Sequence, residues 1–306
     1  MQVLVAEDDF TSRTILAAIL AKWGYDPLVV EDGSSAWEIM KKSDAPNLAV
    51  LDWDMPGMDG LEVCQRIRKA CTSNPPYLII LTAKGEKADI VKGLDAGAND
   101  YISKPYDNDE LQSRIRVGRR MVELQTELLE AKDALAHEAM HDSLTGALNR
   151  RAVLDGLNRE LKRAERKKTR LSIGLCDIDH FKQVNDTYGH QMGDEVLRGF
   201  VHTMQNNLRP YDFVGRYGGE EFLVVAPDST GSVEEGLYER LKTQIAQQRT
   251  STKKGEIGIT VSIGVAGVDS GTTVETMLAA ADAALYRAKD EGRNRVCYST
   301  SDKRGS

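Results

Sequence analysis

The sequence has no long apolar run and no segment that resembles a secretion signal. Its longest apolar runs, such as Leu78–Leu81, are far shorter than the roughly 20 residues that a helix needs to cross a bilayer. The first residues, Met1–Ala6, carry neither a basic segment nor a small-residue cleavage site. We therefore expect a cytoplasmic protein that does not associate with a membrane.

Paired cysteines and an excess of basic charge are also lacking. The four cysteines are scattered without a CxxC pair, which argues against a disulfide framework or a zinc site. The net charge is −7, from 40 basic and 47 acidic residues. Nucleic acid is therefore not an expected partner, because its binding depends on neutralising phosphates. A small anionic nucleotide in a local basic pocket remains compatible with this charge. The 306 residues suffice for two domains and a connector.

Short apolar runs alternate with helical patterns across residues 1–107. The helical patterns include Thr11–Trp23 and Gly60–Ala70. This alternation predicts an α/β domain with a doubly wound parallel sheet. The expected strands are Val3–Ala6, Leu48–Leu51, Leu78–Leu81 and Asp100–Ser103.

Polar side chains follow these strands. Chemistry in such sheets collects at the carboxyl ends of the strands, so we expect convergence of Glu7, Asp8, Asp52, Thr82 and Lys104. Three close carboxylates repel one another without a cation, and hard oxygen ligands suit Mg²⁺. The set predicts phosphoryl transfer, with Asp52 as nucleophile and with Lys104 and Thr82 on the phosphoryl oxygens.

These residues resemble the receiver domain of two-component response regulators. The matching segments are Ala6–Asp8, Leu51–Gly60, Leu81–Ala83 and Ser103–Tyr106. The resemblance implies a flavodoxin-like fold, phosphorylation of Asp52 by a sensor histidine kinase, and a contribution of the Asp54 carbonyl to the Mg²⁺ site of Glu7, Asp8 and Asp52. It also implies a receiver switch. For Tyr101 taken alone, a half-buried core tyrosine is an equally good interpretation. The switch residues are Thr82, Tyr101 and Lys104. A cis peptide at Lys104-Pro105 is usual in this family.

Residues 108–140 contain no proline and predict a helical linker. Apolar residues recur in alternating steps of four and three, which is a heptad seam. One interpretation is an amphipathic helix packed on its own domain. We favour a coiled coil between two copies of the chain, because a lone helix would leave its stripe wet. The seam residues are Val117, Met121, Leu124, Leu128, Ala131 and Leu135.

Residues 141–298 predict a second domain, and residues 299–306 a disordered tail. Hairpins mixed with crossovers indicate an α+β sheet with antiparallel parts. The expected helices are Arg151–Lys167, Gly193–Leu208, Val233–Gln247 and Val274–Glu291. The expected strands are Leu171–Asp179, Phe222–Ala226, Ile257–Ala266 and Arg295–Tyr298, with a hairpin around Gly218-Gly219.

Acidic residues stand at the ends of two of these strands. Glu220 and Glu221 follow the Gly218-Gly219 turn, where missing side chains let a phosphate chain approach. Asp177 ends another apolar strand. If the strands are neighbours, Asp177 and Glu220 can share one or two Mg²⁺ ions, which would clamp the attacking and leaving oxygens of an in-line displacement.

The second domain resembles the GGDEF family of diguanylate cyclases, in its Gly-Gly-Glu-Glu-Phe variant, over essentially all of residues 141–298. The resemblance implies a nucleotidyl-cyclase, palm-like fold that makes cyclic di-GMP from two GTP. Beyond the hairpin it rests on Asp142–Arg151, Asp177–Lys182, Asn185-Asp186, Gly189-His190, Gly193-Asp194, Ala281-Asp282, Ala284–Tyr286, Ala288-Lys289 and Gly292–Asn294.

The resemblance implies a role for individual residues. Asp177, Glu220 and the carbonyl of Ile178 would bind Mg²⁺, or Mn²⁺ in its place, with Glu221 supporting the catalytic geometry. Asn185 and Asp194 would read the guanine edge. Lys289 and Arg293, four residues apart on one expected helical face, would neutralise the triphosphate. Phosphate would also meet Phe181, Lys182, Gly218 and Gly219. Asp179 is read as a structural acid outside the metal set.

Each active site holds one GTP, but the product needs two. Two copies must face each other, so we expect a homodimer activated by phosphorylation of the receiver. Arg209 and Asp212 match the spacing of the family's product-inhibition site, with Arg240 as a further candidate contact. A surface ion pair is the alternative interpretation, and the spacing relative to Gly218 favours product feedback. A silent cyclic di-GMP receptor is the alternative function. Because Asp177, Glu220 and Glu221 are all present, an active cyclase is favoured.

Overall fold

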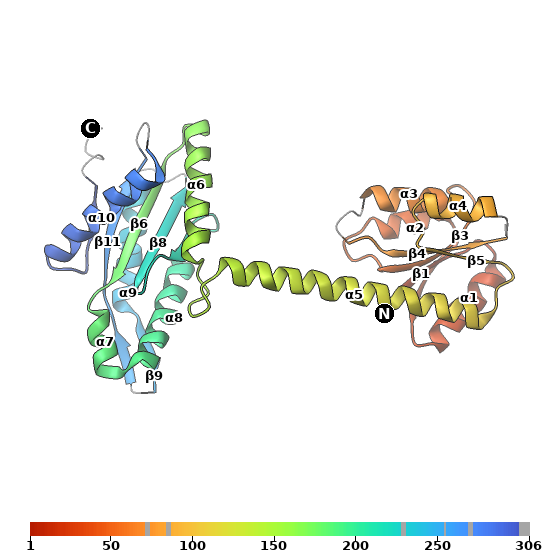
Figure 1. The fold of residues 1–306 in the computed structure, drawn as a ribbon, viewed down its shortest axis with the longest axis horizontal. Coiled ribbons are helices and arrows are strands. Elements are labelled where there is room, and N and C mark those ends of the chain that lie inside the picture. The colour runs from red at the N-terminus through yellow and green to blue at the C-terminus, as the bar shows by residue number, and fades with distance from the viewer. Residues whose placement is uncertain (71–73, 84–86, 228–230, 254, 269–271, 300–306) are drawn as a thin grey trace. The chain divides into compact units, whose positions relative to one another are not determined.

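The computed structural model describes residues 1–70, 74–83, 87–227, 231–253, 255–268 and 272–299 (Figure 1). Except for Ser299, the predicted tail at 299–306 lies outside the described residues. The chain forms two compact units, Met1–Asp133 and Ala134–Ser306, and each is described by itself. No described helix combines the length and the apolar character needed to cross a membrane.

The first unit is the expected doubly wound parallel sheet, in the order β2-β1-β3-β4-β5. One apolar cluster lies between the sheet and α2–α3, and another between the sheet and α1 and α5. The strands are β1 (Gln2–Ala6), β2 (Asp26–Val30), β3 (Leu48–Asp52), β4 (Tyr77–Thr82) and β5 (Asp100–Ser103). The helices are α1 (Phe10–Lys22), α2 (Gly33–Met40), α3 (Gly60–Ala70), α4 (Lys87–Asp95) and α5 (Asn108–Met140).

Strand β2 was not among the expected strands. It lies at the edge of the sheet and is only half-buried, so its apolar pattern is weak. Pro27 belongs to it, and an edge strand tolerates proline because one side of its backbone needs no ladder hydrogen bond. The central strand β3 is buried throughout and carries the clearer signal.

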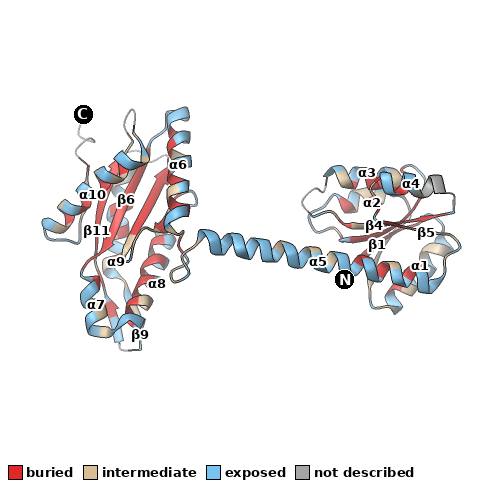
Figure 2. Cartoon of the chain, viewed as in Figure 1, coloured by how far each residue is buried: buried red, intermediate tan, exposed pale blue. Residues whose placement is uncertain are grey.

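Helix α5 has two apolar stripes. Leu111, Ile115 and Gly118 are buried against the receiver sheet, and a β-carbon at Gly118 would lie 2.6 Å from Leu48 Cδ1. The heptad seam is a different stripe and stays exposed, with Leu128 70% and Leu135 65% exposed (Figure 2). The stripe of Leu111, Ile115 and Gly118 packs on its own domain, whereas pairing of the exposed seam with a second copy stays a prediction.

The second unit has the expected α+β sheet, in the order β12-β11-β6-β8-β7, antiparallel except for the β11–β12 pair. Its strands are β6 (Leu171–Ile178), β7 (Phe213–Arg216), β8 (Glu221–Pro227), β11 (Val261–Gly267) and β12 (Val296–Tyr298), beside a separate pair, β9 (Arg249–Thr252) and β10 (Gly255–Gly258). Its helices are α6 (Arg150–Lys167), α7 (Phe181–Tyr188), α8 (His190–Asn207), α9 (Gly231–Gln247) and α10 (Val274–Asp290).

The single strand expected at Ile257–Ala266 is wrong. Its first residues belong to β10, which leaves the main sheet and pairs with β9, and the sheet resumes at β11. Gly258 ends β10, and a β-carbon there would meet only the flexible end of the Arg249 side chain. Helix α7 is an additional element that the periodicity did not predict.

Candidate functional site

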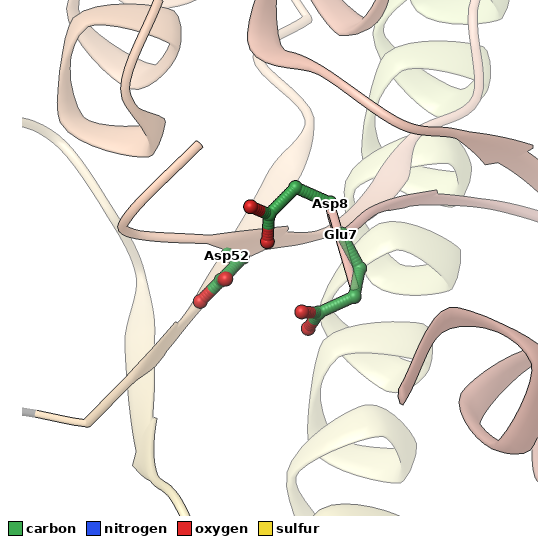
Figure 3. A group of neighbouring side chains, drawn as sticks. All are labelled: Glu7, Asp8 and Asp52. Carbon is green, nitrogen blue, oxygen red and sulfur yellow. The ribbon is translucent and has the colours of Figure 1, made fainter. Parts of the chain in front are cut away.

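Three carboxylates of the first unit lie close together. Glu7 follows β1 and Asp52 ends the neighbouring strand β3, since Ala6 pairs with Leu51 in parallel register. One oxygen each of Glu7, Asp8 and Asp52 lies within 4.8 Å of the others (Figure 3). Within the described part of the chain, no other group of three potential metal ligands meets this spacing. The strand ends thus bring the predicted acids together.

Lys104 binds two of these acids. Its Nζ donates to Glu7 Oε2 at 2.8 Å and lies 3.0 Å from Asp52 Oδ1. Burial raises the pKa of the Glu7 and Asp52 carboxyls, against the effect of the lysine. Burial alone would lower the pKa of Lys104, but its hydrogen bonds to both acids raise it. Three carboxylates against one ammonium leave net negative charge on hard oxygen donors, so the set fits Mg²⁺.

The other predicted receiver residues lie on or just after strands β3, β4 and β5. Thr82 ends β4 and is buried, and its carbonyl accepts the Lys104 N–H at 2.7 Å. Tyr101 lies on β5 and is half-buried, which fits a switch and a core tyrosine equally. Asp54 is exposed two residues beyond Asp52. The peptide bond Lys104-Pro105 is cis, as predicted.

In the second unit, two adjacent strands present acids at the same level. Asp177 on β6 pairs in antiparallel register with Glu221 on β8, and the Ile178 N–H donates to the Glu220 carbonyl at 3.4 Å. Lys289 Nζ lies 2.7 Å from Asp177 Oδ2. The condition set for a shared site, that the strands be neighbours, is therefore met.

The carboxylates around Glu221 repel one another. Burial raises the pKa of the Glu221 carboxyl, Asp177 raises it further, and Lys289 acts in the opposite direction. Asp282 adds to the repulsion, and no role was predicted for it. The sequence signal that could have found Asp282 is its position, because it lies two helical turns before Lys289 on α10. Crowded carboxylates and the Ile178 carbonyl are a donor set that fits Mg²⁺.

Arg216 holds the glycine turn in place. Its Nη2 donates to the Gly219 carbonyl at 2.8 Å, and its Nη1 donates to Asp142 Oδ1 at 3.1 Å. Burial alone would raise the pKa of Asp142, but hydrogen bonds from Thr145 and the charge of Arg216 lower it. A β-carbon at Gly218 would lie 2.6 Å from Glu221 Oε2. Neither Asp142 nor Arg216 was predicted as a site residue.

The residues predicted to read guanine come from α7 and α8. Asn185 lies on α7 and Asp194 on α8, and both are partly exposed. A β-carbon at Gly193 would collide with Asn185 Oδ1, so the amide lies directly against α8. At the start of α7, Phe181 is buried in the core and Lys182 is exposed.

Lys289 and Arg293 do not share a helical face, and this prediction is wrong. Helix α10 ends at Asp290, and Gly292 begins a left-handed turn in which Arg293 has φ 62° and Asn294 φ 46°. The glycine ends the helix because it adopts positive φ without steric cost. The Arg293 N–H donates to the Ala288 carbonyl at 3.0 Å, which closes this turn.

Arg209 and Asp212 are linked through the backbone. The Arg209 N–H donates to Asp212 Oδ2 at 3.0 Å, and the Arg209 guanidinium donates to the Tyr211 hydroxyl at 3.5 Å. Asp212 Oδ1 is buried without a hydrogen-bond partner, and burial raises the Asp212 pKa against the charges of Arg209 and Arg240. Next to it is a cavity of about 280 Å³, also lined by His141 and Gln205. An unpaired buried oxygen favours a ligand donor there over a surface ion pair.

Comparisons with known proteins match both units. The sequence model of the family "Diguanylate cyclase, GGDEF domain" matches residues 139–295, and that of "Response regulator receiver domain" matches residues 3–116. The Response regulator PleD of Caulobacter vibrioides is 32% identical over 298 residues, 96% of this chain and 65% of PleD. This chain therefore spans slightly less than two thirds of that relative's length.

Two further relatives each match about three fifths of the chain. Diguanylate cyclase DosC of Escherichia coli is 38% identical over 187 residues, 61% of this chain and 40% of DosC. The crystal structure of the coiled coil and GGDEF domain of DgcB from Caulobacter crescentus, in complex with c-di-GMP, has a TM-score of 0.56 and 34% identity. It covers 62% of this chain and 99% of that chain.

Proposed function

Because the chain belongs to the GGDEF diguanylate cyclase family, in the response-regulator form that also carries a receiver domain, we propose that it condenses two GTP into cyclic di-GMP and two pyrophosphates under receiver control. The observation that carries the proposal is the register of Asp177 with Glu221, with Lys289 bound to Asp177. This arrangement gathers carboxylates and one ammonium beside the glycine turn.

Asp177, Glu220 and the Ile178 carbonyl would hold the divalent metal, Mg²⁺ or Mn²⁺. A bound metal supplies positive charge that stabilises the attacking and leaving oxygens. Glu221 would support the catalytic geometry, because it pairs with Asp177 across the neighbouring strands β8 and β6. Arg216 fixes the turn that precedes these acids, since it donates to the Gly219 carbonyl.

Specificity for GTP would come from Asn185 and Asp194. The Asp194 carboxylate accepts hydrogen bonds from the N1–H and N2–H₂ groups of guanine, whereas adenine would leave this acid unpaired. Lys289 and Arg293 would neutralise the triphosphate. The phosphates would also lie along Phe181, Lys182, Gly218 and Gly219.

The reaction requires two copies, each holding one GTP. The 3′-hydroxyl oxygen of one GTP attacks the α-phosphorus of the other and forms a new P–O bond. The bond to the bridging oxygen breaks, pyrophosphate leaves with the electron pair, and the hydroxyl proton passes to water. A second, identical step closes the ring. Basic side chains such as Lys289 favour the departure of the anionic leaving group.

Control would begin when Asp52 accepts a phosphoryl group from a sensor histidine kinase. Mg²⁺ would be held there by Glu7, Asp8, Asp52 and the Asp54 carbonyl. Lys104 would exchange its bonds to Glu7 and Asp52 for bonds to the new phosphoryl oxygens. Thr82 and Tyr101 would be the switch residues that respond to the phosphoryl group. The exposed seam of α5 would pair two copies and relay the change as altered register or rotation.

Product inhibition would act at Arg209 and Asp212. The unpaired Asp212 Oδ1 suits a guanine donor, and Arg209 suits a product phosphate. The charge of Arg240 lowers the Asp212 pKa and its guanidinium donates to the Asn207 carbonyl at 2.9 Å, which supports a role as a secondary contact.

Turnover of GTP with Mg²⁺ and chromatographic identification of the product test this function. We expect cyclic di-GMP from the wild type and at least about 100-fold less from Glu220→Gln, which retains the shape of the side chain but not its charge. If the wild type makes no product but binds cyclic di-GMP, the chain is a silent receptor and the cyclase proposal is wrong.

A further inference from the structure

Asp179 joins three segments around the cyclase site. It lies two residues beyond Asp177 and is 5% exposed. Its Oδ1 accepts a hydrogen bond from Ser262 Oγ at 2.6 Å. Its Oδ2 accepts from Thr260 Oγ1 at 2.7 Å and from the Asn294 N–H at 3.0 Å. The carboxylate therefore connects the end of β6, the start of β11 and the turn after α10.

The turn after α10 needs such support. Arg293 and Asn294 are consecutive non-glycine residues in the left-handed region, at φ 62° and 46°. This conformation costs roughly 1 kcal/mol or more per residue, so surrounding contacts must maintain it. The Arg293 N–H bonds to Ala288, and the Asn294 N–H bonds to Asp179. The Asp179 bond ties the turn to the residue that follows the strand bearing Asp177.

We propose that Asp179 is a positioning residue for Arg293: it fixes the left-handed turn so that the guanidinium is presented to the GTP triphosphate. The proposal rests on the phosphate-binding role that the proposed function gives to Arg293. Ser262 and Thr260 anchor the carboxylate, and the Asn294 N–H transmits its position to the turn.

A double-mutant cycle distinguishes positioning from general stabilisation. The ligand is guanosine 5′-(α-thio)triphosphate with Mg²⁺, and calorimetry measures its affinity for the full chain. We expect Asp179→Ala and Arg293→Ala each to weaken binding about tenfold, and the double variant to bind no more weakly than Arg293→Ala. Additive losses, about 100-fold in the double variant, would overturn the proposal.

Two further variants complete the design. Asp179→Asn can turn its single oxygen to the Asn294 N–H while the Ser262 hydroxyl reverses, so we expect affinity within about threefold of the wild type. Ser262→Ala removes one anchor at Oδ1 and leaves the Thr260 and Asn294 bonds at Oδ2, so it should lower Tm and weaken binding less than Asp179→Ala does. A loss of affinity equal to that of Asp179→Ala would contradict transmission through the Oδ2 bond to Asn294. If Asp179→Ala does not fold, Asp179→Glu, which displaces the carboxylate, must show the same coupling to Arg293→Ala.

The binding readout separates this inference from the proposed function. A wild type that binds the thiotriphosphate but makes no cyclic di-GMP contradicts the cyclase and leaves the coupling to decide on Asp179. Binding with additive losses contradicts the role of Asp179 alone. A wild type that does not bind the nucleotide overturns both.

Discussion

The ammonium of Lys289 lies 2.7 Å from Oδ2 of Asp177, the acid proposed to bind metal. The pair joins α10 to β6 and places one positive charge among several carboxylates. Metal at Asp177 would replace this ammonium and free it for the triphosphate. The pair would thus link metal binding to phosphate binding.

Replacing Lys289 with methionine should increase the stabilisation that Mg²⁺ gives to the cyclase domain. Without the ammonium, the acids repel one another in the metal-free protein, and Mg²⁺ no longer competes with a bound lysine. We expect the rise in Tm on adding Mg²⁺ to exceed that of the wild type by about 2–4 °C. Lys242→Met, which removes an exposed pair with Glu239, is the control. Equal shifts in both variants would contradict the competition.

Asp142 should make the stability of the cyclase domain depend on acid pH. Burial opposes its ionisation, but Thr145 and Arg216 lower its pKa below the ordinary 3.8. Its contribution is therefore complete above about pH 3.8 and is lost as the pH falls through the lower folded-state pKa. Asp142→Asn should cost about 2 kcal/mol at pH 6, with a difference from the wild type that shrinks below pH 4. Urea unfolding at each pH measures it, and a difference independent of pH would argue against the ion pair.

Gly193→Ala should impair recognition of guanine more than folding. The added methyl would collide with Asn185 Oδ1 and displace the amide. We expect the KM for GTP to rise about tenfold and the preference for GTP over ATP to fall. Gly199→Ala changes another glycine of α8 that faces Thr250, so it controls for helix propensity. Similar KM values in the two variants would contradict a specific role of Gly193 in recognition of the guanine base.

Leu128→Glu should weaken self-association. Leu128 is 70% exposed on the α5 seam, and a buried carboxylate would oppose the pairing of two helices. We expect the dimer dissociation constant, measured by analytical ultracentrifugation, to rise at least about tenfold, with a parallel loss of cyclase activity. Ala136→Glu, on an exposed position outside the seam, should change neither. A dimer that tolerates Leu128→Glu would place the interface elsewhere.

Strand ends were predictable from the sequence because one local pattern determines them. The run before Asp52 is apolar throughout and buried, so the position of the acid at the end of the strand follows directly. Asp177 near the end of β6 follows a run that is also buried, although it includes Ser172. Once the sheet order brings such ends together, the acids meet without further information.

Contacts between distant segments were not predictable in this way. The bond from Arg216 to Asp142 joins residues 74 positions apart, and the bond from Asn294 to Asp179 spans 115. The expected strand at Ile257–Ala266 ignored that β10 has another partner, and the expected helical face ignored the stop at Gly292. In each case tertiary pairing, or a single glycine, outweighed periodicity.

The most direct test of the central claim is GTP turnover with and without beryllofluoride, a phosphoryl mimic, in the wild type and in Asp52→Ala. A receiver-controlled cyclase predicts that beryllofluoride raises the rate of cyclic di-GMP formation by about tenfold or more in the wild type and has no effect on Asp52→Ala. Equal stimulation of both proteins, or a wild-type rate indifferent to beryllofluoride, would contradict control through Asp52.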